Sequence, residues 1–232
     1  MKQRLQKYLA SQNLASRRVA ETYIQAGYVW VNGECVTQLG SQVDPDFDHI
    51  ELRLPKPVTH TTIAFNKPRG IMSNCALPGE KEIIDLLPRT YQHLHTIGRL
   101  DKDSEGLILL TDDGVLAKHV LAAEFPHTRD YLVWVNDHLT EEMKEQLESG
   151  MLLLGTATKK LQIQQYSDTY FKMTLKEGKN RQIRRMLLQV GLIVLRLKRI
   201  CFGPISLEAL PKGEFRVLSK EECAALAEHA EH

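Results

Sequence analysis

One carboxylate in this chain stands apart from any familiar catalytic motif. Asp101 lies in the stretch GRLDKDSEGLILLTDDG, from Gly98 to Gly114, between a polar loop and the four aliphatic residues 107–110. No glutamate–histidine pair, paired cysteines or glycine-rich phosphate loop stands nearby. A carboxylate can act as a nucleophile when it is ionised, but enclosure raises its pKa unless a cation lies beside it. The question is therefore what such a carboxylate does and which basic group holds it.

A basic helix is one source of such a cation. In EGKNRQIRRMLLQVG, a turn is expected at 179–180 and a helix over about 181–190, with a glycine as its stop. At 100° per residue, Arg181 and Arg185 lie opposite the apolar side, where they could meet phosphate, and Arg184 falls at its edge. A partly buried guanidinium needs an anionic partner, which periodicity cannot name. An ordinary basic amphipathic helix is the alternative.

Two basic clusters stand out in a chain that is nearly neutral overall. The 232 residues carry a net charge of +1, yet residues 1–18 hold five cations and no acid, and residues 172–199 hold nine cations and one acid. The clusters favour a polyanionic partner touched at two places. For either cluster alone, a solvated surface is the alternative. Hydrophobic residues at 43% and charged residues at 25% indicate a globular protein with a proper core.

Several classes of protein are not expected from the composition. The N-terminus is too polar for a signal peptide and no apolar run approaches a membrane span, so we expect a cytoplasmic protein without a membrane partner. The four cysteines lack a paired spacing and fit free thiols in a reducing compartment. We expect no metal site. A ligand pair at His93 and His95 is the alternative to solvent-exposed histidines.

Residues 1–54 predict a small separate domain. Apolar residues at helical spacing predict a first helix, and Ser16 is a suitable N-cap for a second over about 17–26, ended by Gly27. Asn32 and Gly33 predict a β-hairpin, because both turn positions need positive φ. The segment RLPKPVTH has two prolines and no periodicity, which predicts a linker.

The residue pattern of this domain indicates RNA binding. The stretch LASRRVAETYIQAGYVWVNGECV closely resembles the S-four-type RNA-binding domain, in which the second helix and the hairpin grip structured RNA. The resemblance implies phosphate contacts from Lys2, Arg4, Lys7, Arg17 and Arg18. A purely structural helical cap is the alternative.

Residues 61–232 predict a second domain with strands and interspersed helices. Strands are expected in TTIAFNKPRG, GLILLTDDG, DYLVWV and TYFKMTLK, the last with a basic outer side. Helices are expected at about 114–124, capped by Asp113, between Thr140 and Gly150, and from about Lys220. Without regular βαβ alternation, this pattern favours an α+β fold on a mainly antiparallel sheet.

Four motifs in this second domain together resemble the RsuA-like family of bacterial ribosomal-RNA pseudouridine synthases. They are NKPRG, GRLDKDSEGLILLTDDG, RDYLVWV and GKNRQIRRM, behind an N-terminal RNA-binding module. The resemblance implies that Asp101 is the catalytic aspartate, Tyr131 the active-site tyrosine and Arg184 the arginine paired with the aspartate. It implies a uracil pocket lined by Ile183, Arg99 and Leu100, and further RNA contacts by Lys67, Lys179, Asn180, Arg181 and Arg185.

Two departures from the family pattern are mild. Ser104 stands where threonine is common, and Arg129-Asp130 stand where lysine–glutamate is frequent, so neither removes a catalytic group. The implied activity is the isomerisation of uridine to pseudouridine in ribosomal RNA, on a uridine flipped out of its stack and without a cofactor. The partner would be ribosomal RNA or a ribosomal subunit precursor, and we expect a monomer. GTATKK and NRQIRRM look closer to the large-subunit members of the family.

Two other functions fit part of the pattern. A non-catalytic RNA-binding ribosome assembly factor could keep this scaffold, although a retired site would be expected to lose at least one implied catalytic residue. A glycoside or nucleoside hydrolase also uses carboxylates at a sugar carbon and needs a second carboxyl group. Asp103, Glu105 and Asp112 are the candidates for that second group, but none accounts for the RNA-binding module.

Overall fold

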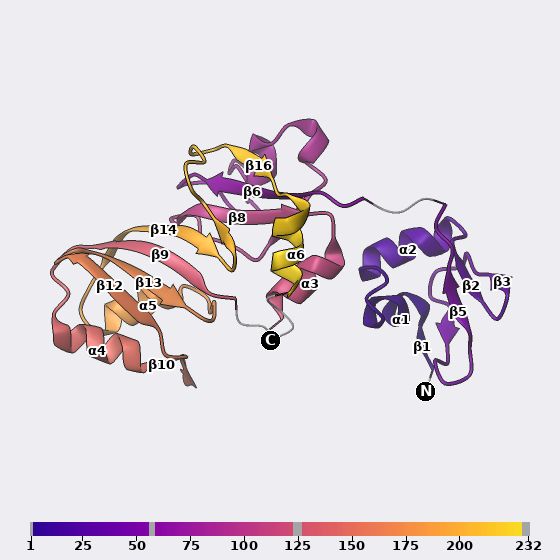
Figure 1. Cartoon of the computed structure of the whole chain (residues 1–232), viewed down its shortest axis with the longest axis horizontal. Helices are drawn as coiled ribbons and strands as arrows, with labels where there is room; N and C mark the ends of the chain where they lie inside the picture. Colours follow the sequence, from indigo (N-terminus) through magenta and orange to yellow (C-terminus); the bar gives the residue numbers. More distant parts are fainter. Residues whose placement is uncertain (1, 56–58, 123–126, 229–232) are drawn as a thin grey trace. The chain divides into compact units, whose positions relative to one another are not determined.

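The computed structural model describes residues 2–55, 59–122 and 127–228 (Figure 1). Two compact units divide the chain: Met1–His60 with Asp113–Lys118, and Thr61–Asp112 with His119–His232. Part of the predicted linker RLPKPVTH, residues 56–58, lies outside the described residues. Within the described ranges, none of the helices is long and apolar enough to cross a membrane.

The N-terminal unit consists of two helices and short strands, as its capping and turn residues predict. Its elements are β1 (Gln3–Arg4), α1 (Leu5–Ser11), α2 (Arg17–Gln25), β2 (Val29–Val31), β3 (Glu34–Cys35), β4 (Gln42–Val43) and β5 (Ile50–Leu52). The Ser16 hydroxyl accepts a hydrogen bond from Val19 N and so caps α2. Asn32 and Gly33 both have positive φ and turn β2 into β3. The predicted second helix and hairpin are confirmed.

A nine-stranded sheet forms the second unit. Its strands are β6 (Thr62–Lys67), β7 (His95–Ile97), β8 (Glu105–Thr111), β9 (Arg129–Val135), β12 (Gln162–Ser167), β13 (Tyr170–Leu175), β14 (Val194–Phe202), β15 (Ile205–Ser206) and β16 (Phe215–Val217). The order is β12-β13-β9-β14-β8-β6-β16, with β15 beside β14 and β7 beside β8. Within the described part of the chain, β8 and β14 are the parallel neighbours of this sheet and its other pairings are antiparallel. The predicted α+β fold on a mainly antiparallel sheet is confirmed.

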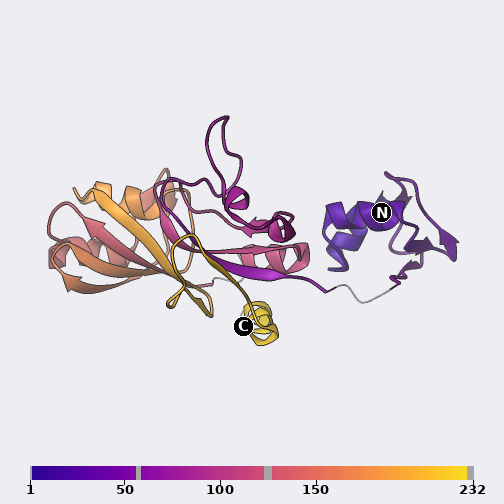
Figure 2. The same ribbon diagram turned by 90° about the horizontal axis from the view of Figure 1, so that it is seen from above.

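Helices and a short hairpin connect or follow the strands of this sheet along the chain. They are η1 (Ile83–Leu86), η2 (Arg89–Tyr91), α3 (Gly114–Leu121), α4 (Glu141–Ser149), β10 (Leu152–Leu153), β11 (Thr156–Ala157), α5 (Gln182–Gln189) and α6 (Lys220–Glu228). Seen from above, the short η helices (purple) and α6 (yellow) lie on opposite sides of the sheet (Figure 2). Thr140 caps α4, and Asp113 accepts hydrogen bonds from the first amides of α3, as predicted.

Two apolar clusters meet at the centre of the sheet. One joins strands β9 and β13 to α4 and α5, through residues such as Val133, Phe171 and Met186. The other joins β6 and β8 to η1. Tyr131 on β9 packs against both clusters, so its ring lies where the two halves of the sheet come together.

Candidate active site

A cavity of about 520 Å³ opens at the junction of the two clusters. It is lined by residues from the loop before β8, from strands β9 and β14 and from the segment that leads into α5. Asp101, Tyr131 and Arg184 all line it, so the structure brings the three predicted catalytic residues together. The predicted pocket residues Ile183, Arg99 and Leu100 line it too, with Ile183 and Leu100 almost fully buried.

Asp101 is held by its loop through main-chain hydrogen bonds. Its carbonyl oxygen accepts from Ser104 N at 3.0 Å, which closes a turn immediately before β8. Its neighbour Leu100 is clamped by the buried Ser73, whose hydroxyl donates to Leu100 O at 2.7 Å and accepts from Leu100 N at 2.9 Å. The loop is therefore fixed on both sides of Asp101. Sequence reasoning missed Ser73, since an isolated serine in a loop carries no local signal of such a contact.

We predict that Ser73→Ala slows catalysis and weakens the fold. The change leaves the buried N–H and C=O of Leu100 without their partner, at a cost of about 1–3 kcal/mol in the free energy of unfolding. It also loosens Asp101, and a displacement of roughly 1 Å can slow a reaction by about 100-fold. Urea unfolding and single-turnover rates measure the two effects. Ser149→Ala, at an exposed position at the end of α4, is the control. If Ser73→Ala equals this control in unfolding free energy and in single-turnover rate, the contact of Ser73 with Leu100 is unimportant.

The basic residue paired with Asp101 is not the predicted one. Arg181 Nη1 lies 3.6 Å from Asp101 Oδ2. Arg184 instead donates from Nη1 to Val194 O and from Nη2 to Asp103 O, each at 3.2 Å. Its Nε is buried and has no hydrogen-bond partner among the residues that the structure describes. The predicted direct pairing of Arg184 with Asp101 is therefore wrong for this structure.

Arg181 lies beside Asp101 because of a local backbone conformation that helical periodicity cannot predict. Helix α5 begins at Gln182, one residue later than predicted, and Arg181 is its N-cap with a φ of 50°. This left-handed conformation takes Arg181 out of the helix, so its side chain lines the cavity instead of the face opposite to it. We predicted that Arg181 lies on the far side of the helix, away from Asp101, and contacts phosphate there. The structure corrects this position, because Arg181 lies beside Asp101.

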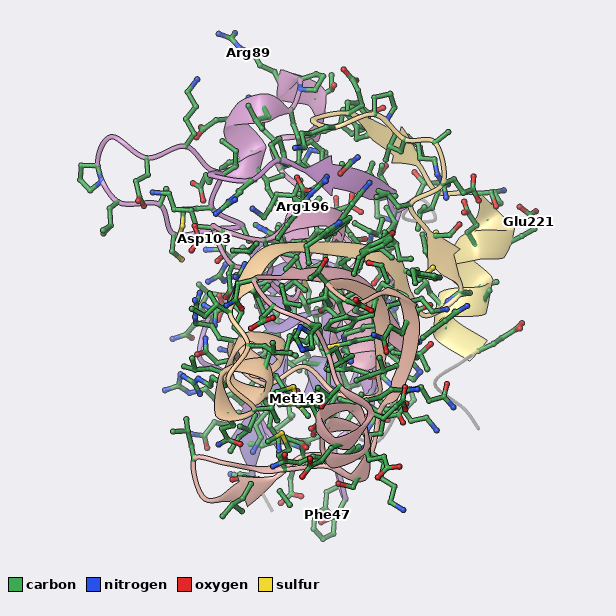
Figure 3. All side chains as sticks on the ribbon, turned by 90° about the vertical axis from the view of Figure 1, so that its left-hand side faces the viewer. Phe47, Arg89, Asp103, Met143, Arg196 and Glu221 are labelled. Carbon is green, nitrogen blue, oxygen red and sulfur yellow. The ribbon has the colours of Figure 1, made fainter. Side chains whose placement is uncertain are left out.

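Arg184 remains an enclosed cation near two acids. Burial lowers the pKa of its guanidinium, the neighbouring Arg181 lowers it further, and Asp101 and Asp103 oppose the change. Its hydrogen bonds tie the loop before β8, where Asp103 lies (Figure 3), to the first residue of β14. The arginine thus holds the loop that carries Asp101, and acts on the acid through the loop and through its charge.

Lys67 lies beneath the site instead of on its surface. The side chain is fully buried, and its Nζ donates to Ile71 O at 2.6 Å and to Pro68 O at 3.0 Å. Burial lowers the pKa of its ammonium to about 8, against the attraction of Asp101, Asp103 and Glu105. The prediction that Lys67 contacts RNA is wrong, because a side chain with no exposed surface cannot reach a phosphate.

A pH-dependent stability follows from this buried ammonium. Above about pH 8 the folded protein has released the Lys67 proton, whereas the unfolded chain keeps it up to about pH 10.4. Between these values the unfolded state binds more protons, so raising the pH stabilises the fold, by up to roughly 3 kcal/mol. The free energy of unfolding of the wild type should rise from about pH 7.5 to about pH 10.5 relative to that of Lys67→Met. Equal pH profiles would contradict this, and the exposed Lys102→Met is the control.

The other predicted RNA contacts divide into exposed side chains on the N-terminal unit and engaged side chains before α5. Lys2, Arg4, Lys7, Arg17 and Arg18 are all exposed on the N-terminal unit. Lys179 donates to Ala157 O at 2.6 Å and lies 3.6 Å from a Glu177 oxygen, and the Asn180 side chain accepts from Arg185 Nη2 at 3.1 Å. These three residues brace the segment before α5, so any phosphate contact there competes with existing bonds.

Two of the three carboxyl groups considered for a hydrolase, those of Glu105 and Asp112, are engaged elsewhere, whereas Asp103 lines the cavity with Asp101. Glu105 is buried between Arg196 and Lys212, with Lys212 Nζ at 2.7 Å, and Asp112 accepts from Thr61 N at 2.8 Å. His93, considered above as a ligand, lies 3.6 Å from Asp112. The described residues hold no group of three or more histidine, cysteine, aspartate or glutamate side chains that could bind a metal ion.

The comparison with known proteins agrees with the geometry of this site. Residues 61–189, more than half of the chain, match the family model of RNA pseudouridylate synthases. The chain belongs to this family. Residues 3–46 match the S4 domain. The predicted family, with its N-terminal RNA-binding domain, is confirmed.

Individual relatives extend over nearly the whole chain. The dual-specificity RNA pseudouridine synthase RluF of Escherichia coli (strain K12) is 39% identical, over 94% of this chain and 76% of its own. The ribosomal large subunit pseudouridine synthase B of Bacillus subtilis (strain 168) is 35% identical, over 99% of this chain and 98% of its own. A crystal structure of a pseudouridylate synthase superposes with a TM-score of 0.72 at 30% identity, covering 96% of this chain and 99% of that one.

Proposed function

We propose that this protein isomerises uridine to pseudouridine in ribosomal RNA, with a large-subunit uridine as its target. The observation that carries the proposal is the meeting of Asp101, Tyr131 and Arg184 in one cavity of a chain that belongs to this family. The names of the relatives, one a ribosomal large subunit enzyme and one a dual-specificity RNA enzyme, support ribosomal RNA as the substrate.

The reaction breaks the bond between N1 of the base and C1′ of the sugar and forms a bond between C5 and C1′. N1 gains a hydrogen and C5 loses its proton, so no electrons are exchanged and the chemistry requires no redox or energy cofactor. Asp101, 3.6 Å from the guanidinium of Arg181, is the group that attacks the substrate or stabilises charge as the first bond breaks. Tyr131 stacks on the uracil and takes the C5 proton, directly or through water.

Ile183 and Leu100 give the uracil an apolar wall, and Arg99 and Arg181 offer cations at the cavity. The uridine reaches this cavity by leaving its stack, which costs roughly a few kcal/mol and favours loops and distorted helices. Contacts of remote phosphates with residues 1–54 offset that cost, and residues 61–232 carry the chemistry. We further propose that the protein acts as a cytoplasmic monomer.

The test uses unmodified ribosomal RNA transcripts labelled with tritium at C5 of uridine, incubated with purified protein and a chelator. We expect tritium release without free uracil, and pseudouridine at one or a few positions. Free uracil would show a hydrolase, and tight binding without tritium release would show an assembly factor. Either result contradicts the proposal.

The proposed role of the N-terminal domain makes a separate prediction. Changing Lys2, Arg4, Lys7, Arg17 and Arg18 together to glutamine should weaken RNA binding without slowing turnover at saturating RNA. The salt dependence should flatten, by about 0.7 in the slope of log affinity against log salt for each phosphate that is no longer neutralised. All five side chains are exposed, so the melting temperature should stay the same. An unchanged slope would mean that this domain does not grip RNA.

A further inference from the structure

Two arginines that face the cavity remain unused by the proposed chemistry. Arg129 and Tyr131 point to the cavity side of β9, and Arg199 and Phe202 point to the same side of β14. Residues three apart on a regular strand point to opposite faces, but a β-bulge at Ile200 breaks the register between Arg199 and Cys201. Arg199 lies opposite Tyr131 in the regular register before the bulge, and beyond the bulge Phe202 lies opposite Arg129, on the same side.

The two guanidinium groups share one aromatic ring. Arg129 Cζ lies 4.9 Å and Arg199 Cζ 5.2 Å from the centre of the Phe202 ring. Each is anchored by one main-chain carbonyl oxygen: Arg129 Nη1 donates to His127 O at 3.1 Å and Arg199 Nε to Leu107 O at 2.7 Å. Arg199 is only 3% exposed, and its Nη2 has no hydrogen-bond partner among the described residues. A charged donor is therefore left unmatched at the wall of the cavity.

No carboxylate balances these charges in the part of the chain that the structure describes. Asp101 is paired with Arg181, and Glu177 accepts from Lys159 N and Gln182 Nε2. Asp130 accepts from Thr174 and faces the opposite side of the sheet. Burial lowers the pKa of Arg129, the neighbouring Tyr131 opposes this change, and Arg199 lowers the pKa further. Two enclosed like charges without a counter-ion cost stability, which is expected where an anionic ligand later enters.

We propose that Arg129 and Arg199 together bind one of the two phosphodiesters that flank the target uridine, and so fix its sugar against Asp101 and Tyr131. This inference rests on the proposed function, since RNA is the ligand. RNA supplies one anion per nucleotide, and a guanidinium matches phosphate oxygens in geometry as well as charge. A neutral uracil carbonyl could accept a hydrogen bond here but would leave both charges unbalanced.

The experiment removes the charge of one RNA linkage and, separately, the charge of each arginine. Short RNAs carry the target uridine with a methylphosphonate, which is uncharged, either 5′ or 3′ to it, and affinity and single-turnover rate are measured for each. In the wild type, one of the two neutral linkages should reduce affinity or rate by roughly 10- to 100-fold, as expected for the loss of a charge-assisted hydrogen bond. Arg129→Gln and Arg199→Gln should show the same loss on the unmodified RNA and little further loss on the neutral one.

The matched control is Arg196→Gln on the same strand. Arg196 (labelled in Figure 3) lies over Trp134 on the opposite face of the sheet, so this variant should keep the full response to the neutral linkage. If the arginines are only structural, their variants lower the melting temperature and keep that response, which overturns the proposal. A wild type indifferent to both linkages overturns it as well. If RNA affinity depends on one of the two linkages but no pseudouridine forms, the result contradicts the proposed function and still supports the phosphate site. If Arg199→Gln does not fold, the less buried Arg129→Gln decides.

Discussion

Asp101→Asn is expected to abolish pseudouridine formation while RNA binding survives. The amide has the size of the carboxylate and can still accept a hydrogen bond, but it is neither a nucleophile nor a negative charge. We expect single-turnover rates to fall by roughly three orders of magnitude or more, as when a catalytic group is removed from other enzymes. The loop should keep its conformation, because Ser73 and Ser104 hold it through main-chain atoms. Tritium release from C5 and filter binding measure the two quantities.

Asp103→Asn is the matched control for this change. Asp103 lies two residues away on the same loop, and its main-chain oxygen, not its carboxylate, accepts from Arg184. The control should therefore keep most of the activity. If both variants lose activity alike, the negative charge of the loop matters as a whole and Asp101 has no special role. If Asp101→Asn retains substantial turnover, the assignment of the catalytic residue is wrong.

Local signals predict the elements that carry the site. Ser16, Asp113 and Thr140 cap their helices in the structure because an N-cap side chain bonds to amides two or three residues away, within reach of a sequence pattern. The run of aliphatic residues predicts strand β8, and all seven of its residues are buried. The positions of Asp101 and Tyr131 follow from the family resemblance, which no periodicity could have supplied.

Features that depend on strand pairing or on single backbone angles escape such signals. The sequence places Arg199 among the cations of a surface cluster, but the register of β14 against β9 sets it opposite Tyr131, on the cavity side of the sheet and buried. Lys67 is the last residue of a mostly apolar strand, where a cation suggests a surface group, whereas carbonyl oxygens of the following loop bind its ammonium inside the protein. Because Arg181 has a left-handed backbone conformation, it forms the ion pair with Asp101 that was expected from Arg184. All three errors concern where a cation points, because long basic side chains carry little periodic signal of burial.

Arg184→Ala is expected to lower both the single-turnover rate and the stability of the fold. The wild-type guanidinium donates to Asp103 O and to Val194 O, and hydrogen bonds from charged groups contribute about 1.5–3 kcal/mol each. Because the site is partly open, we expect a loss of about 2–5 kcal/mol in the free energy of unfolding. The loop would also lose its tie to β14, and a shift of Asp101 by roughly 1 Å would slow the reaction by about 100-fold. Urea unfolding and single-turnover rates at saturating RNA test both effects.

Arg181→Ala provides the contrast, because it removes the ion pair to Asp101 without removing the tie. Arg181 and Asp101 are 43% and 29% exposed, and an ion pair so open to water contributes about 0–1 kcal/mol. This variant should keep its stability, lose affinity for RNA and lose less rate than Arg184→Ala.

Arg184→Lys keeps the positive charge but not the planar guanidinium, so it can bond to only part of the pair of carbonyl oxygens. Its rate and stability should lie between those of the wild type and Arg184→Ala. If Arg184→Ala instead loses affinity alone, with its rate and unfolding unchanged, then Arg184 is a phosphate contact and another group must hold the loop of Asp101.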